Sequence, residues 1–138
     1  MPEDELHATP YARMGGAETV RSLAHRFYFL VDNDPQYRDL RALHPGSLEP
    51  VQESLAGWLS AWTGGPRDWF DTHPGVCMMS MHRSMGISRR IARQWTDAMR
   101  RAIDADPAID AELGAQLGDA LSRMAGAMVT HAEPLAAA

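Results

Sequence analysis

His82 is the side chain in this sequence best suited to bind a metal ion. It lies in the segment from Cys77 to Met85, which is rich in methionine and almost free of charge. Surroundings of low polarity favour the neutral imidazole, whose ring lone pair is free to bind a metal. A lone histidine among apolar residues is more often a hydrogen-bonded core residue. The choice between the two roles therefore depends on the rest of the chain.

Aromatic side chains at helical spacing accompany this histidine. Tyr28 lies in an apolar stripe, Trp58 lies in a helical segment that ends at the Gly-Gly-Pro run of 64–66, and Trp95 follows 13 residues after His82. Each aromatic residue alone is typical of a core. Taken together with His82, the set indicates a haem pocket.

Composition and charge are those of an ordinary globular domain. The chain has 138 residues, of which 45% are hydrophobic and 22% are charged. A net charge of −5 argues against nucleic-acid binding. The single cysteine cannot form an internal disulfide, and it excludes covalent haem attachment through Cys-x-x-Cys-His. With neither a signal peptide nor an apolar run that spans a membrane, we expect a cytoplasmic protein without membrane or nucleic-acid partners.

Hydrophobic residues recur at helical spacing along most of the chain, and strand patterns are almost absent. The pattern predicts helices over about 20–32, 35–44, 48–62, 89–103 and 107–128, a short helix around His82, and an irregular segment over 67–76. The predicted helix starts are Asp34-Pro35, Ser47, Ser88 and Asp106-Pro107. We expect one all-α domain over 13–131, with an antiparallel final pair of helices, a flexible N-terminal extension (1–12) and a flexible tail (132–138).

Several motifs follow one another in a particular order. They are Gly15-Gly16-Ala17-Glu18-Thr19, Arg26-Phe27-Tyr28, Leu43-His44-Pro45, Gly64-Gly65-Pro66-Arg67, His82, Trp95 and Ala127-Met128-Val129. No single motif is specific, but their order and spacings resemble those of the truncated haemoglobins, in particular group II. This resemblance covers nearly the whole chain. It implies a two-over-two sandwich of helices around haem b (iron protoporphyrin IX).

The resemblance also implies roles for individual residues. His82 matches the proximal ligand of the iron, while Tyr28 and Trp95 match distal residues that face a bound ligand. His44 stands beside the haem, where it could hydrogen-bond the ligand or Tyr28, cap its helix or lie exposed. Val51 matches the gate position of the distal pocket. The other expected cofactor contacts are Leu55, Trp58, Trp69, Met78 and Arg83.

The sequence departs from the family pattern at the haem propionates. Many relatives carry arginines where this chain has Met81 and Ser54. Arg83 or Arg67 could replace them as anchors. The methionine-rich stretch also replaces aromatic and proline residues that are common in relatives.

The resemblance predicts a five-coordinate haem that binds O₂, and also NO and CO. Bound O₂ takes up partial negative charge, so the Tyr28 hydroxyl and the Trp95 indole N–H should stabilise it. Redox turnover of NO or peroxide, of the NO dioxygenase or peroxidase kind, remains open, as do a reductase partner and the choice between monomer and homodimer.

Two other functions fit the same residues. In an electron-transfer or redox-sensing haem protein, His44 or a methionine would occupy the sixth coordination position. In a helical interaction module without a cofactor, the methionine-rich segment would be a docking face. The visible absorption spectrum distinguishes all three.

Overall fold

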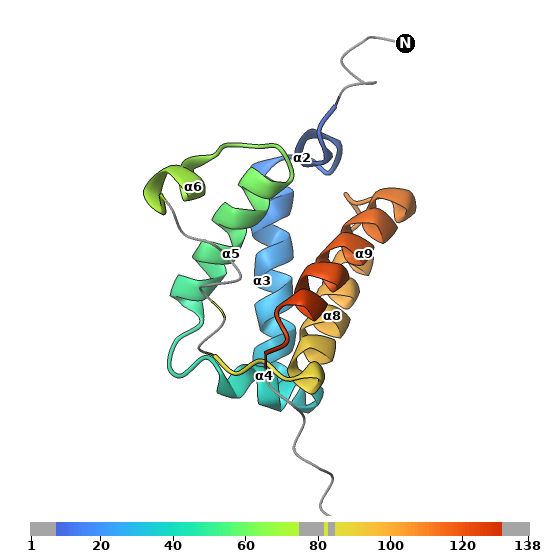
Figure 1. Cartoon of the computed structure of the whole chain (residues 1–138). Helices are drawn as coiled ribbons and strands as arrows, with labels where there is room; N and C mark the ends of the chain where they lie inside the picture. The colour runs from blue at the N-terminus through green and yellow to red at the C-terminus, as the bar shows by residue number, and fades with distance from the viewer. Residues whose placement is uncertain (1–7, 75–81, 83–84, 131–138) are drawn as a thin grey trace, which may run out of the picture.

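The computed structural model describes residues 8–74, 82 and 85–130, and these residues contain helices and turns but no β-strand. Figure 1 shows the helices gathered around the long helix α3. In chain order the elements are α2 (Pro10–Arg13), α3 (Ala17–Asn33), the 3₁₀ helix η1 (Pro35–Tyr37), α4 (Arg38–Ala42), α5 (Glu49–Trp62), α6 (Asp68–Thr72), α8 (Arg89–Asp104) and α9 (Ala111–Ala127).

The central helix α3 buries one apolar stripe, as its sequence predicts. Val20, Leu23 and Phe27 are almost completely buried on it. The helix ends at Asp34, whose carboxylate accepts a hydrogen bond from the Gln36 amide at 3.0 Å. Proline at the first position of η1 supplies the backbone angle that a helix start requires. The predicted start at Asp34-Pro35 is therefore confirmed.

The Gly-Gly-Pro run ends α5 and leaves room for α2. Gly64 has a φ of +103°, and a Cβ atom there would lie 2.8 Å from the Thr9 side chain. A Cβ on Gly65 would lie 2.5 Å from the ring of Tyr11. The Tyr11 amide donates to the Thr63 carbonyl at 2.9 Å, which ties α2 to the end of α5. Thus α2 occupies part of the segment that we expected to be a flexible extension.

The start of α5 lies one residue later than predicted. Ser47 accepts a hydrogen bond from the Glu49 amide at 3.2 Å, and Leu48 is the cap residue. By contrast, Ser88 caps α8 as predicted, because its hydroxyl accepts from the Ile91 amide at 3.2 Å.

The last two helices pack against each other in antiparallel register. A Cβ on Gly114 would lie 3.0 Å from Ile103, and one on Gly118 would lie 2.7 Å from the Arg100 guanidinium. Residues later in α9 thus meet residues earlier in α8, as an antiparallel pair requires. Figure 1 shows the two helices side by side on one flank of the molecule.

The predicted start of the last helix at Asp106-Pro107 is wrong. Helix α9 begins at Ala111, and the Asp110 carboxylate accepts from the Leu113 amide at 2.8 Å. Asp106 is buried, and its carboxylate accepts from the Ala108 amide at 3.0 Å in a turn. Both aspartates suit a helix cap, but Asp106 also lies 3.5 Å from the Arg26 guanidinium and is held in the turn.

The predicted irregular segment 67–76 contains the short helix α6. Its Thr72 hydroxyl donates to the Asp68 carbonyl at 2.9 Å, and Trp69 is buried. One and a half turns are too short to produce a periodic pattern. Most of the short helix expected around His82 lies outside the described residues, but His82 itself is helical.

The long helices form two packed pairs, and contacts of α3 with α8 join one pair to the other. Helix α3 packs on α5, α8 packs on α9, and α3 also contacts α8. This is the predicted all-α arrangement of two helices over two. In the described part of the chain, no helix combines the length and the apolar character that crossing a membrane demands.

Candidate functional site

A cavity lies between the two helix pairs, and it collects most of the predicted site residues. Its walls come from α3, α4, α5, α6, α8 and α9, together with the turn that follows His82. Eight of the residues predicted from sequence line it: Tyr28, His44, Val51, Leu55, Trp58, Trp69, His82 and Trp95. The other two, Met78 and Arg83, lie outside the described residues.

His82 lies in the wall of this cavity next to α8. It is half-buried, and the Met85 amide donates to the His82 carbonyl at 3.0 Å. The chain then turns at Gly86, whose φ of +66° suits the end of a helical turn, and enters α8 three residues later. This short connection fixes the position of the histidine relative to α8.

Tyr28 and Trp95 carry hydrogen-bond donors, and both line the cavity. Tyr28 is only 5% exposed, and its ring meets Phe27 edge-on with centroids 4.8 Å apart. Trp95 lies in α8 with its ring centroid 5.4 Å from that of Phe27. Within the residues that the structure describes, neither the Tyr28 hydroxyl nor the Trp95 indole N–H has a hydrogen-bond partner. Burial raises the pKa of Tyr28, so the phenol keeps its proton.

His44 lies at the end of α4 and presents a neutral ring to the cavity. Its Nδ1 lies 3.0 Å from the Leu40 carbonyl oxygen, so Nδ1 carries the proton and donates. Burial lowers the pKa of His44, and the charges of Arg41 and His82 lower it further, although the bond to Leu40 opposes this shift. The ring also meets Tyr28 edge-on, with centroids 5.8 Å apart. Nε2 is therefore the ring nitrogen of His44 that carries a lone pair and can accept a hydrogen bond or bind a metal.

Helix α5 supplies an apolar wall. Val51, Leu55 and Trp58 are spaced so that they share one face of the helix, and all three line the cavity. Trp58 is buried and stacks on Trp62, with ring centroids 5.4 Å apart. Val51 and Leu55 offer no side-chain donor, and the Trp58 indole N–H has no hydrogen-bond partner among the described residues.

Trp69 lines the cavity from α6, and its indole N–H already has a hydrogen-bond acceptor in the protein. The Nε1 atom donates to the Ser54 hydroxyl at 3.1 Å. The ring stacks on His73 with centroids 4.3 Å apart. Trp69 is therefore a fixed part of the wall rather than a donor to a ligand.

Of the two arginines considered as propionate anchors, only Arg67 is described. It is exposed, and its guanidinium carbon lies 5.0 Å from the centre of the Phe70 ring. It does not line the cavity. A role for Arg67 or Arg83 at the propionates stays a prediction.

Sequence reasoning missed several residues that line the cavity. The helical stripes placed most of them in the core, and periodicity cannot separate a core contact from a pocket wall. The missed residues are Leu40, Leu43, Ser54, Met85, Ile87, Ile91, Ala92, Leu121, Met124, Ala125 and Met128.

The chemistry of this cavity fits haem. The described residues hold no cluster of three or more His, Cys, Asp or Glu side chains that could bind a metal ion. His82 in the cavity wall has an imidazole nitrogen that could hold haem iron, whose other ligands a macrocycle would supply. The apolar walls suit the faces of such a macrocycle, and the Tyr28 and Trp95 donors suit a polar ligand.

A helical cavity with a histidine in its wall and aromatic donors is the site of a globin. The chain belongs to the bacterial-like globin family, whose model matches residues 9–130. It is a truncated haemoglobin of the two-over-two, group II kind. Haem is its cofactor, and small gaseous molecules are the ligands of that haem.

Solved structures agree with this assignment. The group II two-over-two haemoglobin from Agrobacterium tumefaciens is 30% identical, with a TM-score of 0.86 over 91% of this chain and 96% of that one. A thermostable haemoglobin from Thermobifida fusca is 34% identical, with a TM-score of 0.78 over 88% and 97%. A cold-adapted truncated haemoglobin from Pseudoalteromonas haloplanktis is 25% identical, with a TM-score of 0.85 over 89% and 98%. A comparison with curated protein sequences finds no match.

Proposed function

We propose that this globin binds O₂ at a five-coordinate haem b whose axial ligand is His82, and that NO and CO bind at the same position. One observation carries the proposal. The Tyr28 hydroxyl and the Trp95 indole N–H line the same cavity as His82, and both lack an acceptor in the described part of the protein. Haem iron supplies an open coordination position at which a diatomic ligand gains electron density.

Tyr28 and Trp95 stabilise that negative charge by donating hydrogen bonds. In a cavity of low dielectric, such donors act more strongly than in water. Their rings pack against Phe27, so the donor atoms are positioned before a ligand arrives. Because burial raises the pKa of Tyr28, its hydroxyl stays a donor at neutral pH. Val51 and Leu55 keep the adjoining wall apolar and exclude water.

Absorption spectra of the ferric, ferrous and CO-bound protein test the proposal. A ferrous spectrum of the five-coordinate, high-spin type that converts fully to a CO form supports it. A ferrous spectrum that is already six-coordinate and low-spin would contradict it.

His44 supports one alternative, a six-coordinate haem protein that transfers electrons or senses redox state. Its Nδ1 proton is held by the Leu40 carbonyl, which leaves the Nε2 lone pair free to bind a metal. The variant His44→Ala separates the two functions. A low-spin ferrous spectrum that becomes five-coordinate in His44→Ala would establish the alternative, whereas an unchanged five-coordinate spectrum would exclude it.

A further inference from the structure

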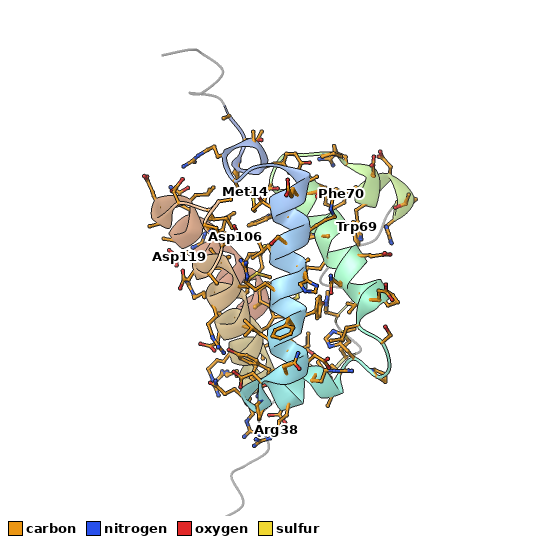
Figure 2. The ribbon with its side chains drawn as sticks, turned by 180° about the vertical axis from the view of Figure 1, so that it is seen from behind. Met14, Arg38, Trp69, Phe70, Asp106 and Asp119 are labelled. Atoms are coloured by element: carbon orange, nitrogen blue, oxygen red, sulfur yellow. The ribbon has the colours of Figure 1, made fainter. Side chains whose placement is uncertain are left out.

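A groove runs along the α8–α9 pair, beside the face that lines the haem cavity. Arg89, Arg93 and Arg100 line its α8 side, and Gly126 and Val129 line its α9 side. Figure 2 places Asp119 of α9 on the flank of the molecule away from α6. The groove is open to solvent, and of its lining residues only Ala92 also lines the haem cavity.

Positive charge gathers in this groove although the chain as a whole carries a charge of −5. Arg89 and Arg93 are exposed, and neither has an ion pair with any residue that the structure describes. Arg100 donates to Asp119 and Ser122 and is partly neutralised.

The acidic group in the groove is Asp97, and it is engaged elsewhere. Its carboxylate accepts a hydrogen bond from the Tyr37 hydroxyl at 2.5 Å. The lining therefore offers more positive than negative charge, and two of its cations have no ionic partner among the described residues.

The position of Arg89 is unfavourable for the helix itself. It is the first residue of α8, and the first turn of this helix contains no acidic residue. A positive charge near a helix N-terminus opposes the helix dipole. Stability of α8 therefore gives no reason for an arginine at this end, whereas binding of an acidic partner does.

The floor of the groove is small and apolar. Ala92 is 8% exposed and lines both the groove and the haem cavity. Gly126 has open space where a Cβ would lie, so the floor can receive a side chain from outside. An apolar centre with arginines around it is typical of a protein–protein interface.

We propose that this groove is the docking surface for a small acidic protein, which places carboxylates against Arg89 and Arg93 and an apolar side chain over Ala92 and Gly126. Complementary charge would steer the partner to this face. The docked protein would then lie one side chain, that of Ala92, away from the haem cavity.

Calorimetric titration of the holoprotein with two compact acidic probes, a plant-type [2Fe–2S] ferredoxin and a flavodoxin, tests the proposal. At least one probe should bind at about 20 mM NaCl and bind more weakly at about 200 mM, because salt screens rim charges. Basic cytochrome c should not bind. If neither acidic probe binds at low salt, the proposal is overturned.

Variants locate the binding. The double change Arg89→Glu and Arg93→Glu should weaken binding about ten-fold, because two attractions become repulsions. The matched control is a second pair of changes, Arg21→Glu with Arg38→Glu, since both arginines are exposed and outside the groove lining and the change in net charge is the same. Equal weakening by the control pair and the groove pair would show that only net charge matters, which would overturn the assigned surface.

A steric variant gives an independent test. Gly126→Trp should block the floor and abolish binding, whereas Gly126→Ala should retain it, because a Cβ at this position meets no atom within 4 Å. The haem spectrum and helical circular dichroism report whether each variant is folded. If Gly126→Trp binds the probe normally, the groove is not the docking site. If the globin forms a dimer that Gly126→Trp abolishes and Gly126→Ala retains, the groove binds a second copy of the chain. That result would contradict the proposal of an acidic partner protein.

Discussion

Tyr28→Phe should speed O₂ release much more than CO release. Tyr28 is 5% exposed, and its ring contacts Phe27 and His44 edge-on. Phenylalanine keeps the ring and these contacts while it removes the hydroxyl. The hydroxyl has no acceptor among the described residues, so its loss leaves no protein group unpaired. The folding stability should therefore change little.

The magnitude follows from the bond that is lost. A hydrogen bond to a charged acceptor contributes about 1.5–3 kcal/mol. Loss of that free energy from the bound state corresponds to O₂ release that is about 10-fold to about 150-fold faster. Bound CO carries little negative charge, so CO release should change by less than about three-fold. Stopped-flow displacement of O₂, and separately of CO, measures both rates on the same preparation.

The comparison of the two ligands is the control. A purely steric role for Tyr28 would change the release of both diatomic ligands to a similar extent. Equal acceleration of O₂ and CO, or an unchanged O₂ rate, would refute the assignment of Tyr28 as a donor.

Three further results are expected. Trp95→Phe should also speed O₂ release, and a double-mutant cycle with Tyr28→Phe should show a coupling of about 0.5–3 kcal/mol, because both donors meet one ligand; strict additivity would separate them. Ser54→Ala should lower the free energy of unfolding by about 1–3 kcal/mol in urea titrations, because the buried Trp69 indole N–H loses its acceptor; unchanged stability would mean that water replaces the hydroxyl. The rate of O₂ release should stay constant between about pH 7 and about pH 10. An ordinary tyrosine has a pKa near 10 and ionises there, whereas the raised pKa of Tyr28 keeps its phenol protonated. A release rate that increases with pH and has its midpoint near pH 10 would contradict this.

The helix starts that the sequence predicted well are those with one clear cap residue. Asp34 and Ser88 each precede a helix, and each side chain accepts the expected amide. The last helix was placed too early because two aspartates, Asp106 and Asp110, both suit a cap. Only the tertiary structure, in which Asp106 lies beside Arg26, decides between them.

The cavity shows a different limit of sequence reasoning. The family resemblance supplied Tyr28, His82 and Trp95, whose side chains come from distant segments and meet only in the folded chain. Leu121 and Met124 line the same cavity, but their helical spacing is equally that of core residues. The hydrogen bond that removes Trp69 from the donors depends on Ser54 in another helix, which no local pattern reveals.

Resonance Raman spectra of the ferrous protein test the central assignment most directly, because the stretch between iron and the axial imidazole reports the ligand itself. The native protein should show this band. His82→Gly should lose it and regain a shifted band when imidazole is added, while His25→Ala, which changes an exposed histidine on α3, should keep the native band. A native band that persists unchanged in His82→Gly would contradict the assignment of His82 as the axial ligand.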